Sequence, residues 1–272
     1  MNFDFPFFLV MATLVTGVVW MVDALFFSVA RKSRGEGEGE PKEPLIVEYS
    51  RSFFPVILAV LVLRSFLVEP FRIPSGSMMP TLLVGDFILV NKFTYGIRLP
   101  VLNKKVLELG EPQRGDVVVF KYPQNPSVDY IKRVVGVPGD TLWYKDKTVY
   151  INGEPQKQVP QGLYTGEGSG ASETGKRESR EHLGEVEHSI LVNPRVPDFG
   201  YGCHVLARGP ITIEPGFYFA MGDNRDNSND SRCWGLVPEK NLVGKAFAIW
   251  MSWDGNRSGF PVTWSRLGSG IK

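Results

Sequence analysis

Two serines and a lysine are the residues of this sequence whose types and spacing suit nucleophilic catalysis. Ser75 and Ser77 flank Gly76 in the stretch PSGSMMPTL. A catalytic serine needs a base to take its proton and donors to stabilise an oxyanion. A glycine beside it lets the backbone turn tightly and expose amide groups. Taken alone, however, the stretch is better explained as an ordinary turn that leads into a strand.

Lys132, in the stretch YIKRVVGV, is the candidate base. Lysine has an ordinary pKa of ~10.4 and is protonated at neutral pH, but burial can lower that pKa by about 3–5 units. Tyr130 and Ile131 precede it and two valines follow Arg133, which alternation along a strand places on the opposite face. The alternative is an exposed strand lysine. The three histidines lie in or beside a polar segment, so a Ser-His-Asp triad has no local support.

A third candidate stretch is GDNRDNSNDSRCWG, residues 222–235. A calcium-binding EF-hand loop needs glycine at its sixth position and glutamate at its twelfth. Counted from either of the first two aspartates, the stretch has neither. Two interpretations remain: a solvated turn, or a buried network in which Ser228 orients a catalytic group while Asp230 pairs with Arg232.

Composition and pattern predict the body that must position these residues. The 272 residues are 43% hydrophobic with a formal net charge of +1, which gives no indication of nucleic-acid binding. The 29 glycines and 20 prolines favour a loop-rich β protein. Runs of β-branched and aromatic residues bounded by turn signals predict antiparallel strands; they lie at 85–93, 115–123, 129–140, 148–155, 216–223 and 243–253.

Two apolar runs precede this β region. Residues 1–30 predict an uncleaved first transmembrane helix, with Asp23 near its far end as the one charge of its apolar stretch. Residues 53–69 predict a second, although Arg64 interrupts a run that is short for a span and equally suits a buried helix.

The basic residues predict the orientation of the chain. Five lysines and arginines lie between the two apolar runs, so residues 31–52 are expected to form a cytoplasmic loop. Residues 70–272 then form an exported region, which in a bacterium lies on the periplasmic or extracellular side of the inner membrane.

Within the exported region, a β-ribbon or loop insertion is expected at about 145–210. Residues 156–200 are polar and rich in glycine and serine, which suggests a flexible ribbon rather than core. Cys203 and Cys233 lack the spacing of a zinc or thioredoxin site. Whether they form a disulfide is left open.

Four stretches, in order, resemble the conserved boxes of the bacterial type I signal peptidases. They are PSGSMMPTL, GDFILVNKF, YIKRVVGVPGD and GDNRDNSNDSRCWG, and they follow two apolar runs. The resemblance covers 53–155 and 211–253 well. It implies a membrane-bound serine endopeptidase that removes signal peptides with a Ser-Lys dyad and needs neither a metal nor an organic cofactor.

The resemblance also implies a role for individual residues. Ser77 is the expected nucleophile, Lys132 its general base, and Ser75 with the Ser77 amide the oxyanion hole. The expected supporting residues are Ser228, Asp230, Arg232 and Tyr130. Substrates of the family carry small residues one and three positions before the cut, as in Ala-x-Ala; the residues expected to line the pockets for them are Phe71, Ile73, Leu82 and Ile131. The expected partners are preproteins, membrane lipid and the secretion translocon, with no nucleic acid.

Two other functions would use some of the same features. A self-cleaving repressor-type protease also uses serine and lysine, but the two apolar runs and the lack of a DNA-binding segment argue against it. A non-catalytic periplasmic β module that binds lipid or peptide would require neither Ser77 nor Lys132.

Overall fold

The computed structural model describes residues 5–29, 31, 43–99, 104–200 and 202–272. The chain divides into two compact units. The first comprises Met1–Val68 with Ile97–Leu107, and the second comprises Glu69–Gly96 with Glu108–Lys272. All the candidate catalytic residues belong to the second unit.

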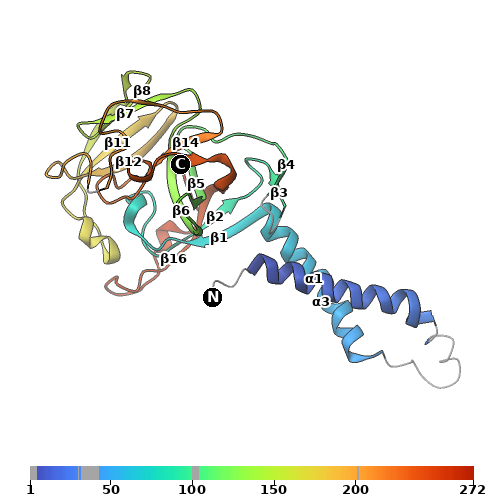
Figure 1. Cartoon of the computed structure of the whole chain (residues 1–272). Coiled ribbons are helices and arrows are strands. Elements are labelled where there is room, and N and C mark those ends of the chain that lie inside the picture. Colours follow the sequence, from blue (N-terminus) through green and yellow to red (C-terminus); the bar gives the residue numbers. More distant parts are fainter. Residues whose placement is uncertain (1–4, 30, 32–42, 100–103, 201) are drawn as a thin grey trace. The chain divides into compact units, whose positions relative to one another are not determined.

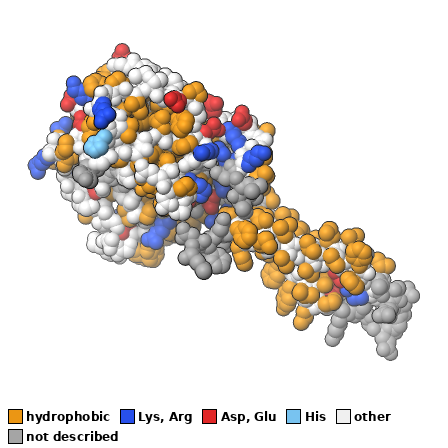
Figure 2. All heavy atoms as spheres, viewed as in Figure 1, with side chains coloured by type: hydrophobic (Ala, Val, Ile, Leu, Met, Phe, Trp, Pro, Cys, Tyr) orange, Lys and Arg blue, Asp and Glu red, His pale blue; other side chains and the backbone are white. Residues whose placement is uncertain are grey.

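The first unit is dominated by two apolar helices that lie side by side (Figure 1). Helix α1 (Phe5–Val22) continues into the π-helical turn η1 (Asp23–Phe27), and α3 (Leu45–Val62) continues into η2 (Leu63–Leu67). Hydrophobic side chains cover much of their visible surface in Figure 2, and many of them are exposed. The unit also contains the short ladder of β3 (Ile97–Arg98) with β4 (Lys105–Leu107).

Both helices are long and apolar enough to cross a membrane, over Pro6–Phe27 and Leu45–Leu67. The second helix begins at Leu45, earlier than the expected boundary at 53. Hydropathy located the continuous apolar run of the helix but not its first two turns, LIVEYSRS, which follow Pro44 and mix apolar with charged and polar residues. Arg51 therefore lies inside the helix, where it pairs with Glu43, and not in a loop.

The second unit is built on one large sheet, of which β1, β2, β5, β6, β14 and β16 are labelled in Figure 1. The strand order is β1-β2-β16-β5-β6-β14-β15, with β17 paired to β16, and the ladders from β2 to β15 are antiparallel. The strands are β1 (Val68–Arg72), β2 (Asp86–Asn91), β5 (Val117–Tyr122), β6 (Asn125–Gly136), β14 (Phe217–Met221), β15 (Val237–Pro238), β16 (Leu242–Ser252) and β17 (Ser269–Gly270).

Two smaller sheets complete this unit. One has the order β13-β7-β8-β9 and the other β10-β11-β12. Their strands are β7 (Thr141–Lys145), β8 (Thr148–Ile151), β9 (Glu154–Pro155), β10 (Gln158–Leu163), β11 (Arg177–Leu183), β12 (Val186–Val192) and β13 (Ile211–Thr212). The short helical elements are η3 (Gly76–Met78), η4 (Gly168–Glu173), α4 (Ser231–Trp234), η5 (Glu239–Asn241) and η6 (Trp264–Arg266). The predicted mainly antiparallel β body is confirmed.

The expectation of a flexible ribbon at 156–200 is wrong in one respect. Leu183 of this segment joins a buried cluster with Leu142 and Phe219, and three consecutive residues at the end of β12 are buried. The segment is polar because its inward-facing positions carry charged residues as well as aliphatic ones. The average polarity of the segment therefore wrongly predicted that none of it packs into the core.

Candidate active site

Ser77 lies in η3, the tight turn between β1 and β2. It is largely buried, and the following residue, Met78, packs into the apolar cluster beneath the sheet. The carbonyl of Ser77 accepts a hydrogen bond from the backbone amide of Asn224, at 3.0 Å. The turn is thus fixed on one side by core packing and on the other by a segment almost 150 residues away in sequence.

Lys132 lies in β6, paired with Val118 of β5. Its side chain is 4% exposed, and its Nζ atom lies 2.7 Å from Oγ of Ser77. The same nitrogen lies 2.8 Å from the carbonyl oxygen of Ile131. These two contacts hold the amine against the serine hydroxyl, so the structure brings the expected nucleophile and base into direct contact.

Burial is the main cause of a lowered pKa at Lys132, which falls from its ordinary value to about 8. The carboxylates of Asp230 and Asp223 act in the opposite direction, and the guanidinium of Arg232 lowers the pKa further. At pH 7 about a tenth of the amine is therefore neutral and able to accept a proton, and the neutral fraction reaches about half near pH 8.

Two more expected residues flank this pair. Ser75 is exposed, and its Oγ lies 3.4 Å from Oγ of Ser77. The ring of Tyr130 lies 5.5 Å from Nζ of Lys132, measured to its centroid, and stacks on Tyr122. Tyr130 thus forms one wall around the amine.

Ser228 lies beside the serine turn, but its hydroxyl does not contact Lys132 in the way expected. Among the described residues, the buried Oγ of Ser228 has no hydrogen-bond partner of good geometry. A Cβ at Gly222 would lie 2.3 Å from that Oγ and 2.4 Å from the Ser77 carbonyl oxygen. Glycine at 222 therefore permits the close approach of these two serines.

The expected ion pair of Asp230 and Arg232 is present and buried. Nε and Nη2 of Arg232 donate to the Asp230 carboxylate at 2.9 and 2.8 Å, and the amide of Gly222 donates to it at 3.0 Å. Burial raises the pKa of Asp230, but the guanidinium outweighs it and the net pKa is below the ordinary value. The pair keeps 222–232 folded back onto itself beside Lys132.

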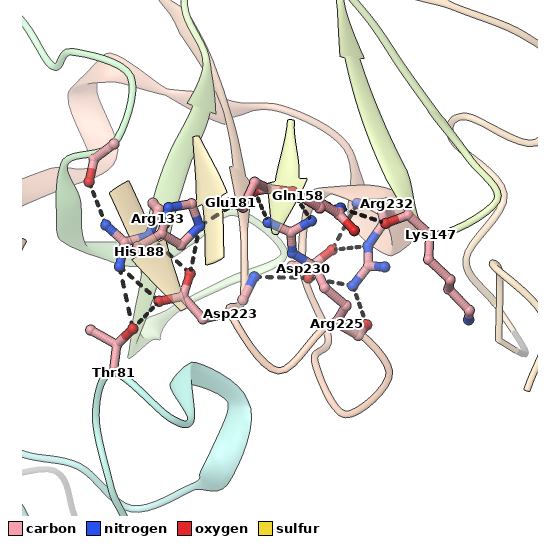
Figure 3. Close-up of polar contacts among 12 residues, drawn as sticks. Thr81, Arg133, Lys147, Gln158, Glu181, His188, Asp223, Arg225, Asp230 and Arg232 are labelled. Carbon is pink, nitrogen blue, oxygen red and sulfur yellow. Dashed lines mark hydrogen bonds and ion pairs between the residues drawn. The ribbon is translucent and has the colours of Figure 1, made fainter. Parts of the chain in front are cut away.

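Sequence reasoning missed a larger buried network next to this pair (Figure 3). Nε and Nη2 of Arg133 donate to the Asp223 carboxylate at 2.9 and 2.7 Å, and Nε2 of His188 lies 3.6 Å from the same carboxylate. The imidazole also lies 3.3 Å from Glu181, which pairs with Arg225. All five side chains are buried.

Strand alternation in the sequence could have revealed that Glu181 is an inward-facing residue of this network. In RESREHL, residues 177–183, every second residue from Ser179 onward is buried, namely Ser179, Glu181 and Leu183. The alternation of a strand is present, but charged residues at inward positions conceal it from hydropathy. Glu181 lies opposite His188 across the β11–β12 ladder, which only the strand register reveals.

Comparison with known proteins places this arrangement in a family. The model of the signal peptidase family, peptidase S26, matches residues 46–253. The chain belongs to the S26 signal peptidase family. Proteins named signal peptidase I from Pseudomonas fluorescens and Pseudomonas aeruginosa are each 50% identical to it, over 98% of this chain and 99% of their own. One from Buchnera aphidicola is 38% identical over 94% of each chain.

As an S26 signal peptidase the chain is a serine peptidase, so the resemblance inferred from the motifs is confirmed. The repressor-type protease and the non-catalytic β module are not supported.

The residues expected to line the substrate pockets of this S26 peptidase share one apolar cluster. Ile73 and Leu82 are buried in it, while Phe71 and Ile131 are half-buried against it. Ile73 and Leu82 are therefore core residues in this structure, whereas Phe71 and Ile131 keep exposed surface that a small substrate side chain could contact.

Cys203 and Cys233, left open from the sequence, are joined in a disulfide. The bond ties the segment after β12 to α4, immediately after Arg232.

Proposed function

We propose that this chain is a membrane-anchored serine endopeptidase that removes signal peptides from exported preproteins, with Ser77 as nucleophile and Lys132 as general base. The observation that carries the proposal is the 2.7 Å contact between Nζ of Lys132 and Oγ of Ser77. A buried amine with a pKa of about 8 suits the base that a serine requires.

The proposed reaction runs in two halves. Oγ of Ser77 attacks the scissile carbonyl carbon while its proton passes to Nζ of Lys132. The ammonium then protonates the leaving amine, the C–N bond breaks, and an acyl-enzyme ester remains. Water, deprotonated by Lys132, attacks the ester and releases Ser77 with its proton restored.

The negative charge that develops on the substrate oxygen must be stabilised by hydrogen-bond donors. We propose the Ser75 hydroxyl and the Ser77 amide for this role, since Ser75 Oγ lies 3.4 Å from Ser77 Oγ. Asp230, Arg232 and Ser228 are proposed as supporting residues: the first two shape the segment beside the amine, and Ser228 lies with the Ser77 carbonyl against Gly222.

We propose that the two helices anchor the chain in the bacterial inner membrane, with residues 70–272 on the periplasmic or extracellular side. The basic residues between the apolar runs support this orientation. A serine a few residues beyond a membrane helix can reach a substrate whose own signal helix is still in the bilayer. Membrane lipid and the translocon are accordingly proposed as partners.

Cleavage of paired substrates tests the specificity. The full chain in detergent is offered a preprotein with an Ala-x-Ala site and a matched preprotein with leucine at the residue before the cut. Shallow pockets should exclude the larger side chain, so we expect cleavage after the second alanine and a rate at least about tenfold lower for leucine. Equal cleavage of both would contradict the small-residue specificity, and cleavage of neither would contradict the proposed function.

The pH profile tests the base. Because burial lowers the pKa of Lys132 to about 8, kcat/KM should rise with pH as the amine loses its proton and level off above that value. At pH 6 it should be about a hundredfold below the plateau, since one pH unit corresponds to a factor of ten. Initial cleavage rates at low substrate concentration between pH 6 and 9.5 measure this. A flat profile over that range would exclude Lys132 as a titrating base.

A further inference from the structure

The insertion contacts the serine turn through the segment 223–225. Leu191, near the end of β12, donates to the carbonyl of Asp223 and accepts from the amide of Arg225, both at 2.9 Å. Asn224, between these two residues, donates its own amide to the carbonyl of Ser77 at 3.0 Å. The segment thus lies between the insertion and the serine turn, with backbone hydrogen bonds to each.

The side chain of Asn224 reinforces this connection. It is fully buried, and its Nδ2 donates to the carbonyl of Gly76 at 2.9 Å and to Glu173 at 2.8 Å. Its Oδ1 accepts from Nζ of Lys176 at 2.9 Å. The orientation of the Asn224 amide is therefore set from the insertion, while one of its hydrogens holds the residue before Ser77.

Glu173 is the centre of this arrangement. It ends η4, is 6% exposed, and accepts a second amide hydrogen bond, from Asn227 at 2.9 Å. It also pairs with Lys176. Burial raises its pKa, but these hydrogen bonds outweigh burial and leave the pKa below the ordinary value, so the side chain is a carboxylate that only accepts.

A second contact brings η4 to the same turn. A Cβ placed on Gly170 would lie 2.6 Å from the terminal methyl carbon of Met79, and one on Gly76 would lie 2.9 Å from the sulfur of that methionine. Met79 is buried between these two glycines. The backbone of the insertion therefore packs directly against the serine turn, independently of the polar contacts.

We propose that Glu173 is a positioning residue for the nucleophile, acting through Asn224 to fix the Gly76–Ser77 turn. The proposal rests on the proposed function and gives the insertion a part in catalysis. Glu173 contacts neither Ser77 nor Lys132 and takes no part in proton transfer. Its effect arises because a small displacement of a reacting group lowers the rate steeply.

Glu173→Gln is the sharpest test, because it keeps the shape and replaces one acceptor oxygen with a donor. Asn224 and Asn227 each donate to one oxygen of Glu173, so the glutamine must present its own NH₂ to one of them. We expect kcat to fall about tenfold with KM nearly unchanged. Glu187→Gln is the matched control: it makes the same charge change on β12, with a side chain that is 51% exposed, and should leave both constants unchanged.

A double-mutant cycle separates positioning from general stability. In an Asn224→Ala background the connection is already cut, so Glu173→Gln should cause little further loss in kcat. Equal losses in both backgrounds would overturn the proposal, as would a Glu173→Gln protein with the kcat of the unmodified chain. The pH midpoint should stay at that of the unmodified chain, because Lys132 is untouched.

Two further outcomes are distinguishable. If Glu173→Gln fails to fold, Lys176→Gln removes a charged donor to Asn224 and should show a smaller loss of kcat with the same dependence on Asn224; an unchanged kcat there would overturn the proposal. If the unmodified chain cleaves no preprotein, the proposed function fails and this inference fails with it. Normal cleavage with no effect of Glu173 overturns the inference alone.

Discussion

Replacing Lys132 with methionine is expected to lower kcat/KM for preprotein cleavage by roughly 10²- to 10⁴-fold, the range of general acid–base catalysis. Methionine keeps the length and apolar character of the buried side chain but has no basic nitrogen. Ser77 would then have no group at 2.7 Å to take its proton. Lys132→Arg should be equally inactive, because a guanidinium stays charged at every accessible pH. Cleavage assays in detergent at pH 8 measure all three proteins.

The loss should come from chemistry and not from unfolding. The pKa of Lys132 is about 8 in the folded chain and higher when unfolded, so burying the amine costs stability in full below pH 8, and the cost fades as the pH rises toward the unfolded value. Lys132→Met should therefore raise the melting temperature at pH 7 or leave it unchanged.

Two controls accompany this prediction. Lys145→Met changes an exposed lysine and should cleave normally. Ser77→Ala alone, Lys132→Met alone and both together should be equally inactive, because the proposed reaction needs both residues in the same step. Full cleavage by Lys132→Arg would make a neutral lysine base untenable.

Arg133→Met is expected to have the largest effect on stability. Arg133 and Asp223 are buried with their side chains paired, so removing the guanidinium leaves an uncompensated carboxylate in the interior. Breaking a buried pair in this way costs about 3–5 kcal/mol. For a region of this size that lowers Tm by on the order of 10 °C, which thermal unfolding of the full chain in detergent would measure.

Arg180→Met is the matched control for Arg133→Met. Arg180 lies on β11 with a side chain that is 52% exposed, 3.9 Å from Glu187, and a pair of this kind contributes little. Adding Asp223→Leu to Arg133→Met should restore part of the lost Tm, because it removes the carboxylate left unpaired. Similar Tm values for the Arg133 and Arg180 variants would show that the buried pair does not stabilise the fold.

These predictions share a structural basis. The stretch 222–232 contacts β6 through Asp223, the serine turn through Asn224, and the insertion through Arg225. Three consecutive residues thus join three parts of the second unit. A change in any of them should affect both stability and the placement of Ser77.

The sequence by itself determined the family. The serine turn, the apolar strand around Lys132 and the Asp230–Arg232 stretch are each weak signals alone, but their order along the chain, behind two apolar runs, resembles the signal peptidases. Alternation and turn residues predicted the strands that carry them. The two apolar helices followed from composition over about twenty residues, since a helix that crosses a membrane needs little else.

Tertiary structure alone decided which distant residues meet. Strand alternation groups Glu181 with Ser179 and Leu183, but it does not indicate that Glu181 and His188 would meet beside Asp223, because those contacts depend on the strand register. Nor could Glu173 be connected with Ser77, since the connection passes through Asn224 and needs the packing of η4 against the turn. The physical reason is that burial of a charge is determined by its partners, and those partners come from strands that only folding brings together.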